Sequence, residues 1–450
     1  MKKKVINVEH HIAHASASYF CSGFNSAAIL SLDGSGEIAT TLMAIAQGNK
    51  IKKLKEIHFP YSIGLLYNTV TQFLGFRIDS GEGKVMGLAP YGKPTYSKEF
   101  EKVIYPTKDG GFKMDMSYFR YHYTGNKKKP FYSKKFIKIF GIPRIPESEI
   151  TKRDEDLAAT LQDATEKIGV HLAKYLYDLT KEKRLCLSGG VALNSVMNFK
   201  ILQETNFDEV YIYPASHDGG TAIGAALYVY YSLLNNPLKP VNQSPYLGPE
   251  YSDNEIEKSL KNFNLKYEKI DNKDKLAKIG AQLVHEGKII GWFQGRTEIG
   301  PRAFGNRSIL CRPYPEEMKK ILNERVKHRE GFRPFAPSAK IERYKEFFEI
   351  DIPSPYMLLV CNTRKEKLKE LSAITHVDGT ARLQTVSKEE NELYWKLIDE
   401  YEKLSGIPVI LNTSFNVRGE PIINSPDDAI KCFLKTHMDA LIIGNFLVKK

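Results

Sequence analysis

The feature that most constrains the fold is a recurring order of an apolar run, a glycine turn and a helix-forming stretch. In RLCLSGGVALN the apolar residues 185–187 predict a buried strand, the serine and glycines predict a turn, and a helix is expected from Val191. The segment VYIYPASHDGGTAIGAALYVYY repeats this order, with its turn at 217–220. The run AAILSLDG also predicts a buried strand that stops at a glycine turn. Each predicted strand therefore carries polar residues at the point where it ends.

Two histidines near the start of the chain and two aspartates at strand ends predict a metal site. His10 and His14 lie four residues apart in HHIAHASASY, and on an α-helix this spacing places both imidazoles on one face. Asp33 and Asp218 each lie just past a predicted strand, and we expect them to face the same rim. Two histidines and two carboxylates suit a divalent first-row metal with positions left open for substrate. The predicted metal ligands are His10, His14, Asp33 and Asp218.

Other interpretations of the histidines stay open at this point. A His-x-x-x-His pair on a helix is common by chance and indicates a metal only when further ligands join it. His11 also forms a helical spacing of three with His14. We prefer His10 as the ligand because the His11 side chain would project away from the face that His10 and His14 share.

Length and composition set the broad class of the protein. A chain of 450 residues is too long for one ordinary core and indicates two or three domains. Its 42% hydrophobic and 26% charged residues are typical of a globular protein. No apolar run reaches about 18 residues, so no transmembrane helix and no membrane partner are predicted. The apolar stretch VINV after MKKK is too short for a signal-peptide core, which makes the cytoplasm the expected location.

The cysteine pattern and the net charge narrow the function classes. The five cysteines are scattered without a Cys-x-x-Cys pair, which indicates reduced structural residues. The net charge of +12 favours anionic partners. Much of the excess lies in lysine runs at 2–4, 52–55 and 127–129, which are typical of solvated surface. An RNA-binding patch is the alternative, but signatures of RNA-binding modules are absent, and no nucleic-acid partner is expected.

Three glycine-containing segments predict backbone that approaches a phosphate. The turn GSGE follows the first strand, although short Gly-x-Gly turns are also frequent in hairpins. In GEGKVMGLAPYGKP the many glycines of a short segment imply backbone that approaches a ligand, with Lys84 as the charge partner of a phosphate, because a plain surface loop would rarely contain Val-Met and Leu-Ala. In LSGGVALN the glycines precede a helix start, where amides suit an anion or a nucleotide. The predicted phosphate-binding residues of these segments are Gly34, Gly36, Lys84, Gly189 and Gly190.

The remaining patterns predict where elements and domains begin and end. A hairpin is expected at 38–59, and amphipathic helices at 61–76 and 157–179, with a peripheral insertion at 95–150. The proline-rich stretch 235–253 has little periodicity and marks a domain boundary. Beyond it we expect two further amphipathic helices, near 254–262 and over 273–285, and then the strand KIIGWFQ.

Three basic or amide-rich segments of the second half predict a phosphate-binding cleft. GRTEIGPRAFGNRSIL alternates arginines with glycines, which is more positive charge than a turn with a buried edge tolerates without anions. VKHREGFRPFAPS adds three more cations, and PVILNTSFNVRGEP places amide and hydroxyl side chains directly after an apolar strand at 408–411. Each basic group alone could be surface, but three clusters interleaved with strands favour a cleft. The residues concerned are Arg296, Arg302, Arg307, Lys327, Arg329, Arg333, Asn412, Ser414 and Asn416.

Nine motifs in a fixed order carry a resemblance to a known family. The motifs are HHIAHASASY, SLDGSGE, GEGKVMGLAPYG, LSGGVALN, HDGGTAIGAA, GRTEIGPRAFGNRSIL, KHREGFRPFAPS, ARLQTV and NTSFNVRGEPI. Over nearly its full length the chain resembles the O-carbamoyltransferases of the nodulation and antibiotic-biosynthesis family. An ordered set of this kind is far more specific than any one motif.

The resemblance implies an α/β protein with two domains. Residues 1–240 would form an actin-like (ASKHA) domain that binds metal and nucleotide and transfers the carbamoyl group. Residues 241–253 would be a linker. Residues 254–450 would form an α/β YrdC-like domain that makes carbamoyl adenylate. Lys-x-Arg and Ser-x-Asn are the signature of that second domain, and this sequence matches it at Lys327, Arg329, Ser414 and Asn416.

The resemblance also implies the reaction and the role of each residue. Carbamoyl phosphate and ATP would give carbamoyl adenylate in the second domain, and a metal in the first domain would position the carbamoyl group for attack by a hydroxyl of a small-molecule acceptor. Fe(II) is the expected metal, and Mg²⁺ would accompany ATP. The implied catalytic residues are Lys327, Arg302, Arg382 and Ser414. The implied cofactor-binding residues are Gly34, Gly36, Lys84, Gly189, Gly190, Asn194, Arg329, Asn412 and Asn416.

One departure from the family pattern concerns the beginning of the chain. Family members carry a further strand and a phosphate-binding turn ahead of the histidine pair, whereas nine residues precede His10 here. We therefore expect the actin-like domain to be N-terminally incomplete. A truncated gene product, one half of a split enzyme and an incorrect start site would each explain this, and in the second case a separate polypeptide would supply the missing region.

Other functions share parts of this pattern. The main alternative is tRNA threonylcarbamoylation, which uses both domain types with threonine and bicarbonate as substrates. A sugar kinase of the actin-like class would keep the first domain, but the Lys-x-Arg and Ser-x-Asn signature argues against it. Hydrogenase-maturation carbamoyltransferases carry cysteine-rich zinc modules that this chain lacks. A basic RNA-binding scaffold is the non-enzymatic alternative.

Overall fold

A computed structural model describes residues 5–124, 129–239 and 244–450 of the chain. The chain divides into two compact units, residues 1–243 and residues 244–450, and each is described by itself. The lysines at 2–4 and 127–128, and residues 240–243 at the predicted domain boundary, lie outside the described residues. None of the helices in the described ranges combines the length and the apolarity that a membrane crossing needs.

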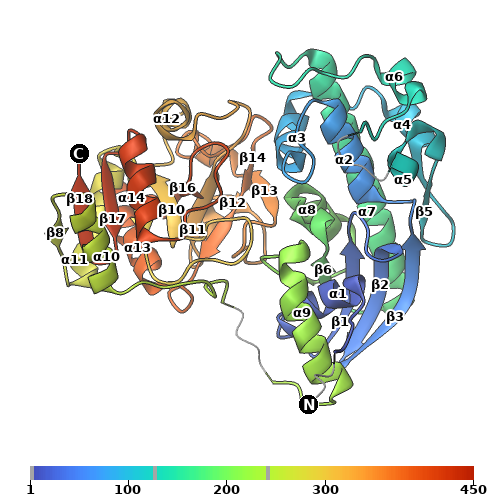
Figure 1. The fold of residues 1–450 in the computed structure, drawn as a ribbon, viewed down its shortest axis with the longest axis horizontal. Coiled ribbons are helices and arrows are strands. Elements are labelled where there is room, and N and C mark those ends of the chain that lie inside the picture. The colour runs from blue at the N-terminus through green and yellow to red at the C-terminus, as the bar shows by residue number, and fades with distance from the viewer. Residues whose placement is uncertain (1–4, 125–128, 240–243) are drawn as a thin grey trace. The chain divides into compact units, whose positions relative to one another are not determined.

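The first unit is built on a five-stranded mixed sheet (Figure 1), in the order β3-β2-β1-β6-β7. Its strands are β1 (Ser26–Leu32), β2 (Ala39–Gln47), β3 (Lys50–His58), β6 (Arg184–Ser188) and β7 (Glu209–Ile212). β2 runs antiparallel to both β1 and β3, whereas β1, β6 and β7 are parallel. The residues that follow these three parallel strands therefore meet at one edge of the sheet.

Helices surround this sheet, and a small two-stranded ribbon lies among them. A core of apolar side chains joins α1 to β1, β2 and β6, and α1 packs against α9 (Figure 1). The helices are α1 (His10–Phe20), α2 (Ile63–Phe73), α3 (Glu82–Leu88), α4 (Ser97–Val103), α5 (Tyr121–Thr124), α6 (Lys134–Phe140), α7 (Lys152–Thr180), α8 (Ser195–Glu204) and α9 (Thr221–Leu227). The ribbon pairs β4 (Ile104–Pro106) with β5 (Phe112–Met114). The predicted hairpin at 38–59 and the helices predicted at 61–76 and 157–179 are confirmed.

The glycine-containing segment at 81–94 is largely helical. It forms helix α3 followed by a 3₁₀ turn at Ala89–Tyr91. The helix forms because Val85 and Leu88 are buried on one face while its glycines need no left-handed backbone. The Lys84 ammonium lies over the Phe76 ring, 5.5 Å from its centroid. A phosphate contact by Lys84 stays a prediction.

The close packing of α1 on α9 depends on Gly224. A methyl group at this position would lie 1.9 Å from the carbonyl oxygen of Ala13 in α1. We expect Gly224→Ala to force the two helices apart and to lower the free energy of unfolding by about 2 kcal/mol or more. Gly83→Ala in α3 is the matched control, because nothing lies within 4 Å of its added methyl group. Urea unfolding curves measure both variants, and equal midpoints would contradict this account of the packing.

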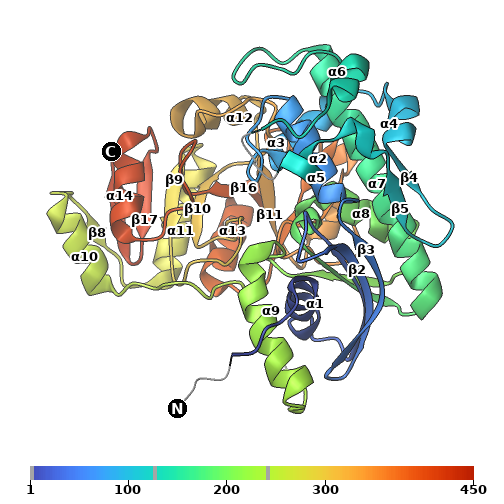
Figure 2. The same ribbon diagram turned by 45° about the vertical axis from the view of Figure 1, so that its right-hand side comes forward.

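The second unit contains an eight-stranded mixed sheet in the order β15-β11-β16-β10-β9-β17-β18-β8 (Figure 2). The bounds are β8 (Glu268–Lys269), β9 (Ile290–Phe293), β10 (Arg307–Cys311), β11 (Ala336–Lys340), β15 (Gln384–Val386), β16 (Val409–Ser414), β17 (Ala440–Ile443) and β18 (Phe446–Lys449). A second sheet joins β12 (Phe348–Glu349), β13 (Val360–Thr363) and β14 (Thr380–Arg382). The helices are α10 (Asp253–Asn262), α11 (Lys273–His285), α12 (Glu317–Leu322), α13 (Glu392–Ser405) and α14 (Pro426–Lys435).

One detail of the second unit differs in position from the sequence pattern. The strand expected at 408–411 continues through Ser414, so Asn412 lies inside β16 and does not follow it. The strand extends because Asn412 pairs with Leu310 of β10 and Ala336 of β11 on its two sides.

Residues from 245 onward hydrogen-bond to the second unit, since Gly248 donates to Thr297 O and Ile299 donates to Pro245 O. All five cysteines are buried and unpaired, as predicted.

Candidate metal centre and basic cluster

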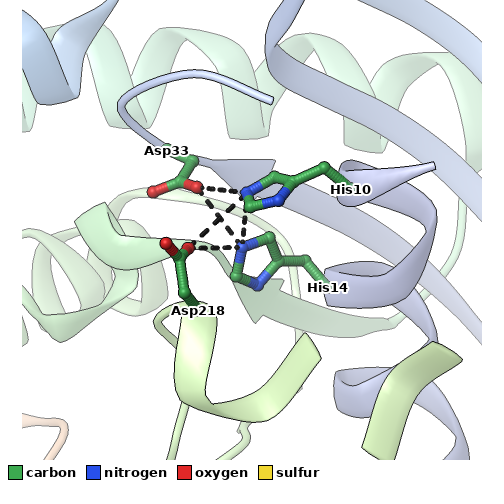
Figure 3. Close-up of side chains that lie close together, drawn as sticks. All are labelled: His10, His14, Asp33 and Asp218. Atoms are coloured by element: carbon green, nitrogen blue, oxygen red, sulfur yellow. Dashed lines mark hydrogen bonds and ion pairs between the residues drawn. The ribbon is translucent and has the colours of Figure 1, made fainter. Parts of the chain in front are cut away.

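Helix α1 and two loops of the first unit bring four predicted ligands together (Figure 3). His10 and His14 project from one face of α1, Asp33 follows β1, and Asp218 starts the turn that leads into α9. One ligand atom of each residue can be chosen so that all four lie within 4.8 Å of one another. Strands β1 and β7 belong to the parallel part of the sheet, which explains why Asp33 and Asp218 share one rim.

The distances between the ligand atoms are short. The Nε2 atoms of His10 and His14 are 3.0 Å apart. Asp33 Oδ2 lies 2.7 Å from His10 Nε2 and 3.3 Å from His14 Nε2. Asp218 Oδ1 lies 3.6 Å and 3.5 Å from the same two nitrogens. Ligands about 2.1 Å from a shared metal lie roughly 3.0–3.5 Å apart, so these spacings suit one ion.

Two hydrogen bonds from outside the four ligands hold Asp33 and His10 in this arrangement. The backbone N–H of Gly190, just after β6, donates to Asp33 Oδ1 at 3.0 Å, which leaves Oδ2 turned to the histidines. The N–H of His10 donates to the Glu37 carboxylate at 3.2 Å. Support of this kind orients the ligands of protein metal sites.

The four ligand side chains differ in solvent exposure, and their charges shift one another's pKa values. The His14 side chain is only 1% exposed, whereas that of Asp218 is 77% exposed, so the group opens to solvent on the Asp218 side. Burial lowers the pKa of His14, but the Asp218 and Asp33 carboxylates raise it to about 9. Burial likewise opposes ionisation of Asp33, yet hydrogen bonds from His10 and His14 hold its pKa below the ordinary value. A divalent cation would take the place of the shared protons.

His11 is not part of the group. Its Nδ1 lies 2.9 Å from Ser31 Oγ and its Nε2 lies 3.1 Å from the carbonyl oxygen of Ala39. Both ring nitrogens are therefore engaged with β1 and β2, and the choice of His10 as the partner of His14 agrees with this geometry. The donor set of two imidazoles and two carboxylates fits a divalent metal, and metal binding itself stays a prediction.

The glycines predicted to approach phosphate lie around this group. A Cβ on Gly36 would be 2.9 Å from the His10 Cβ, so the GSGE turn packs directly on a ligand. Gly189 has φ +83°, and a Cβ there would lie 2.1 Å from the carbonyl oxygen of Leu32. Asn194 caps α8 by accepting from Met197 N and pairs with Gln162. These contacts give the residues structural roles, and phosphate or nucleotide binding by Gly34, Gly36, Gly189, Gly190 or Asn194 stays a prediction.

In the second unit the loop after β16 holds a buried lysine. Lys327 ends the π-helical turn Asn323–Lys327. Its Nζ donates at 2.8 Å to the carbonyl oxygens of Ser414 and Asn416 and to Asn416 Oδ1, and lies 3.4 Å from Ser414 Oγ. Among the described residues, all of these acceptors are uncharged. Burial, and next the charge of Arg329, lowers the pKa of Lys327 well below its ordinary value.

Arg329 and Arg333 act electrostatically on this lysine, and two further arginines act on them or on each other. Burial lowers the pKa of Arg382, at the end of β14, well below its ordinary value, and Arg302, Arg329 and Arg333 lower it further. Within the described residues, the buried Nε atoms of three of these arginines have no hydrogen-bond partner. Those three are Arg302, Arg329 and Arg382. We call Lys327, Arg302, Arg329, Arg333 and Arg382 the basic cluster.

The remaining predicted basic residues have other surroundings. Arg307 is fully buried, stacks 3.6 Å from the Phe293 ring centroid and donates to the carbonyl oxygens of Gln294 and Gly295. Its terminal nitrogens donate to backbone carbonyls and the Glu298 carboxylate favours its charge, so Arg307 lies outside the basic cluster. Within the described residues, its Nε has no hydrogen-bond partner. Arg296 is exposed and donates to Leu247 O. Arg296 and Arg307 differ from Arg302 in burial and in the direction in which the backbone points the side chain. The alternation of arginine with glycine does not reveal either property.

Sequence reasoning missed several residues beside the basic cluster. Glu330 lies 3.7 Å from both Arg333 and Arg418 and brings a carboxylate to the cluster. Glu298 and Gln384 hold the loop that carries Arg302. Glu298 and Glu330 lie within the motifs GRTEIGPRAFGNRSIL and KHREGFRPFAPS, and a carboxylate among so many cations was the signal that could have identified them.

Family models match most of the chain. One described as "Carbamoyltransferase N-terminus" matches residues 1–227, and one described as "Carbamoyltransferase C-terminus" matches residues 281–450. The metal ligands lie in the first match, and the basic cluster lies in the second.

Several curated proteins are similar along nearly the whole chain. An uncharacterized protein of Synechocystis is 44% identical over 98% of this chain and 76% of its own length. The nodulation proteins NolNO of Sinorhizobium fredii and NolO of Bradyrhizobium diazoefficiens are each 40% identical over 98% of this chain. The match covers 64% of NolNO and 79% of NolO.

The similarity to solved structures is weaker. The crystal structure of full-length HypF in the phosphate- and nucleotide-bound form is 21% identical, with a TM-score of 0.28, over 40% of this chain and 22% of that one. A similarity this low supports no argument about the site.

Proposed function

The chain belongs to the carbamoyltransferase family, and from this premise we propose that it transfers a carbamoyl group from carbamoyl phosphate, via carbamoyl adenylate, to a hydroxyl of a small-molecule acceptor. The chain spans 64% of the length of NolNO. We assign activation to the second unit, as a YrdC-like domain, and transfer to the first, as an actin-like domain. The sheet order β3-β2-β1-β6-β7 is compatible with an actin-like subdomain.

The observation that carries the proposal is the basic cluster. Lys327 is buried and its acceptors are neutral oxygens, and the four arginines are partly buried. The Glu330 carboxylate offsets part of this positive charge, and the remaining excess of like charges favours the binding of a further anion. ATP and carbamoyl phosphate together supply several negative charges, and arginine and lysine stabilise the charge that develops during phosphoryl and adenylyl transfer. Arg302, Arg329 and Arg382 would hold phosphate groups, and Lys327 would face the bond that breaks.

The atom balance defines the products of activation. Carbamoyl phosphate must release phosphate, with water entering, for its carbamate oxygen to bond to the α-phosphorus of ATP. Pyrophosphate then leaves ATP, and carbamoyl adenylate remains. Ser414 and Asn416 hold the Lys327 ammonium in place during this exchange, since all three belong to one hydrogen-bonded group.

The transfer step is assigned to the metal group of the first unit. A divalent cation at His10, His14, Asp33 and Asp218 would supply Lewis acidity that polarises the carbamoyl carbonyl. Gly190 keeps Asp33 turned to this position, and α1 fixes the two imidazoles. The exposed Asp218 side leaves an approach for an acceptor hydroxyl.

An assay of pyrophosphate release tests the proposal. Native protein with ATP and carbamoyl phosphate should release pyrophosphate and form carbamoyl adenylate. Threonine and bicarbonate in place of carbamoyl phosphate should release none, because tRNA threonylcarbamoylation is the alternative that would use them. No pyrophosphate from folded protein with carbamoyl phosphate would contradict the proposal, and ADP as the product would favour a kinase.

A further inference from the structure

We propose that Glu298 is a positioning residue, which together with Gln384 and Asn412 holds the loop at 300–306 so that Arg302 enters the basic cluster. This inference rests on the proposed function, because the cluster is taken as the site that binds phosphate groups. It also gives Asn412 a different role from the cofactor contact that the family resemblance implies. The loop joins β9 to β10 and is the segment in which Arg302 lies.

The Glu298 carboxylate binds the loop from within. Its Oε1 atom accepts hydrogen bonds from the backbone N–H groups of Phe304 and Asn306, both at 2.8 Å, and of Arg307 at 3.1 Å. The residue is only 8% exposed. Within the described residues, its Oε2 atom has no hydrogen-bond partner. A buried carboxylate that accepts three backbone N–H groups closes the loop with charge-assisted bonds, which are about twice as strong as neutral ones.

Neutral side chains hold the carbonyl side of the same loop. Asn412 Nδ2 donates to the carbonyl oxygen of Ala303 at 3.1 Å, and Gln384 Nε2 donates to that of Phe304 at 3.0 Å. The Tyr246 hydroxyl donates to the same Phe304 oxygen at 2.9 Å. Asn412 Nδ2 also lies 3.0 Å from Gln384 Oε1. Hydrogen bonds therefore hold both the N–H groups and the carbonyl oxygens of the backbone directly after Arg302.

The position of Arg302 explains why the loop needs such support. Burial lowers the pKa of Arg302 to about 10, and the charge of Arg333 contributes to this shift. The charge of Arg302 in turn lowers the pKa of Arg382. Without an anion these guanidinium groups repel one another, and a loose loop would let Arg302 turn to solvent. Bonds to the backbone of 303–307 oppose this movement without neutralising Arg302 itself. The cluster is therefore preorganised for an anion before one binds.

Pyrophosphate binding to Glu298→Gln tests the proposal. We expect the native chain to bind pyrophosphate in calorimetry and Glu298→Gln to bind it about tenfold or more weakly, because a neutral amide replaces the carboxylate acceptor. KM for carbamoyl phosphate should rise by a similar factor, while kcat changes much less. Tyr246→Phe removes one neutral bond to the loop and introduces no buried polar group. Tyr246→Phe should weaken pyrophosphate binding about threefold. This variant tests the proposal if Glu298→Gln fails to fold.

The matched control is Glu255→Gln, at an exposed helix start of the same unit, where the carboxylate also accepts a backbone N–H. It should bind pyrophosphate as the native chain does. If native protein binds pyrophosphate and the folded loop variants bind it equally well, the positioning role is wrong while the proposed function stands. A fall in kcat without a rise in KM would also overturn the positioning role. If the native chain binds no pyrophosphate, the proposed function and this inference both fail.

Discussion

Lys327→Met is expected to lower the rate of carbamoyl adenylate formation about 100- to 1000-fold, because it removes a preorganised positive charge beside the phosphate groups that react. Lys327 is 3% exposed, and Ser414 and Asn416 hold its ammonium in a fixed position. Methionine keeps most of the side-chain volume and removes the charge. Pyrophosphate release under saturating ATP and carbamoyl phosphate measures the effect.

The fold should survive this change. Lys327 is a buried cation among other cations, so removing its charge relieves repulsion. Of its three acceptors, Ser414 O still accepts from Asn416 N–H and Asn416 Oδ1 still accepts from the Ser414 hydroxyl, so the main cost is the lost bond to Asn416 O. Circular dichroism and the thermal midpoint report the fold directly. Lys261→Ala, an exposed lysine paired with Glu257 in α10, is the matched control and should retain the native rate. A native rate of pyrophosphate release in Lys327→Met would exclude the lysine from activation.

His14→Ala is expected to weaken divalent metal binding at least about 100-fold, since even the outer partners of metal ligands contribute 10- to 100-fold. His14 Nε2 lies between 3.0 and 3.5 Å from the chosen atoms of the other three ligands, and the side chain is almost completely buried. Calorimetry with Fe(II), Mn²⁺ and Zn²⁺ measures the loss and identifies the preferred ion. Transfer to the acceptor should stop, whereas pyrophosphate release should continue.

The two readouts separate the two units. His58→Ala replaces a half-exposed histidine at the end of β3 in the same unit, so it should bind metal as the native chain does. If His14→Ala stayed folded and lost pyrophosphate release as much as transfer, the assignment of the metal to transfer alone would be wrong. If it bound metal with native affinity, the four-residue group would not be the site.

Local patterns predicted the elements that carry the metal group. The spacing of His10 and His14 required only one helical turn, and Asp33 required only that an apolar run end at a glycine. Both depend on contacts close in sequence, and the helix and the strand form where expected. The choice between His10 and His11 followed from helix geometry, and it agrees with the bonds of His11 to β1 and β2.

The basic cluster was predicted less well. Arginines that alternate with glycines indicated a charged turn but did not distinguish Arg302, which enters the cluster, from Arg307, whose terminal nitrogens donate to backbone carbonyls. Asn412 had the residue type of a ligand contact, yet it lies inside a strand and holds a loop. Residues 81–94 had the glycine content of a loop and formed a helix, because buried Val85 and Leu88 outweighed the glycines.

By itself, the sequence determined the succession of strands, turns and helices, the residue types of both groups and, through its ordered motifs, the family. The tertiary structure decided which polar side chains gather in the two candidate sites and which form hydrogen bonds with backbone groups instead. The physical reason is that burial and hydrogen-bond partners come from segments far apart in the chain, as when Glu298 binds the loop of Arg302 and Gly190 orients Asp33 across 157 residues. Residue type limits what a side chain can do, and its neighbours in space select the role.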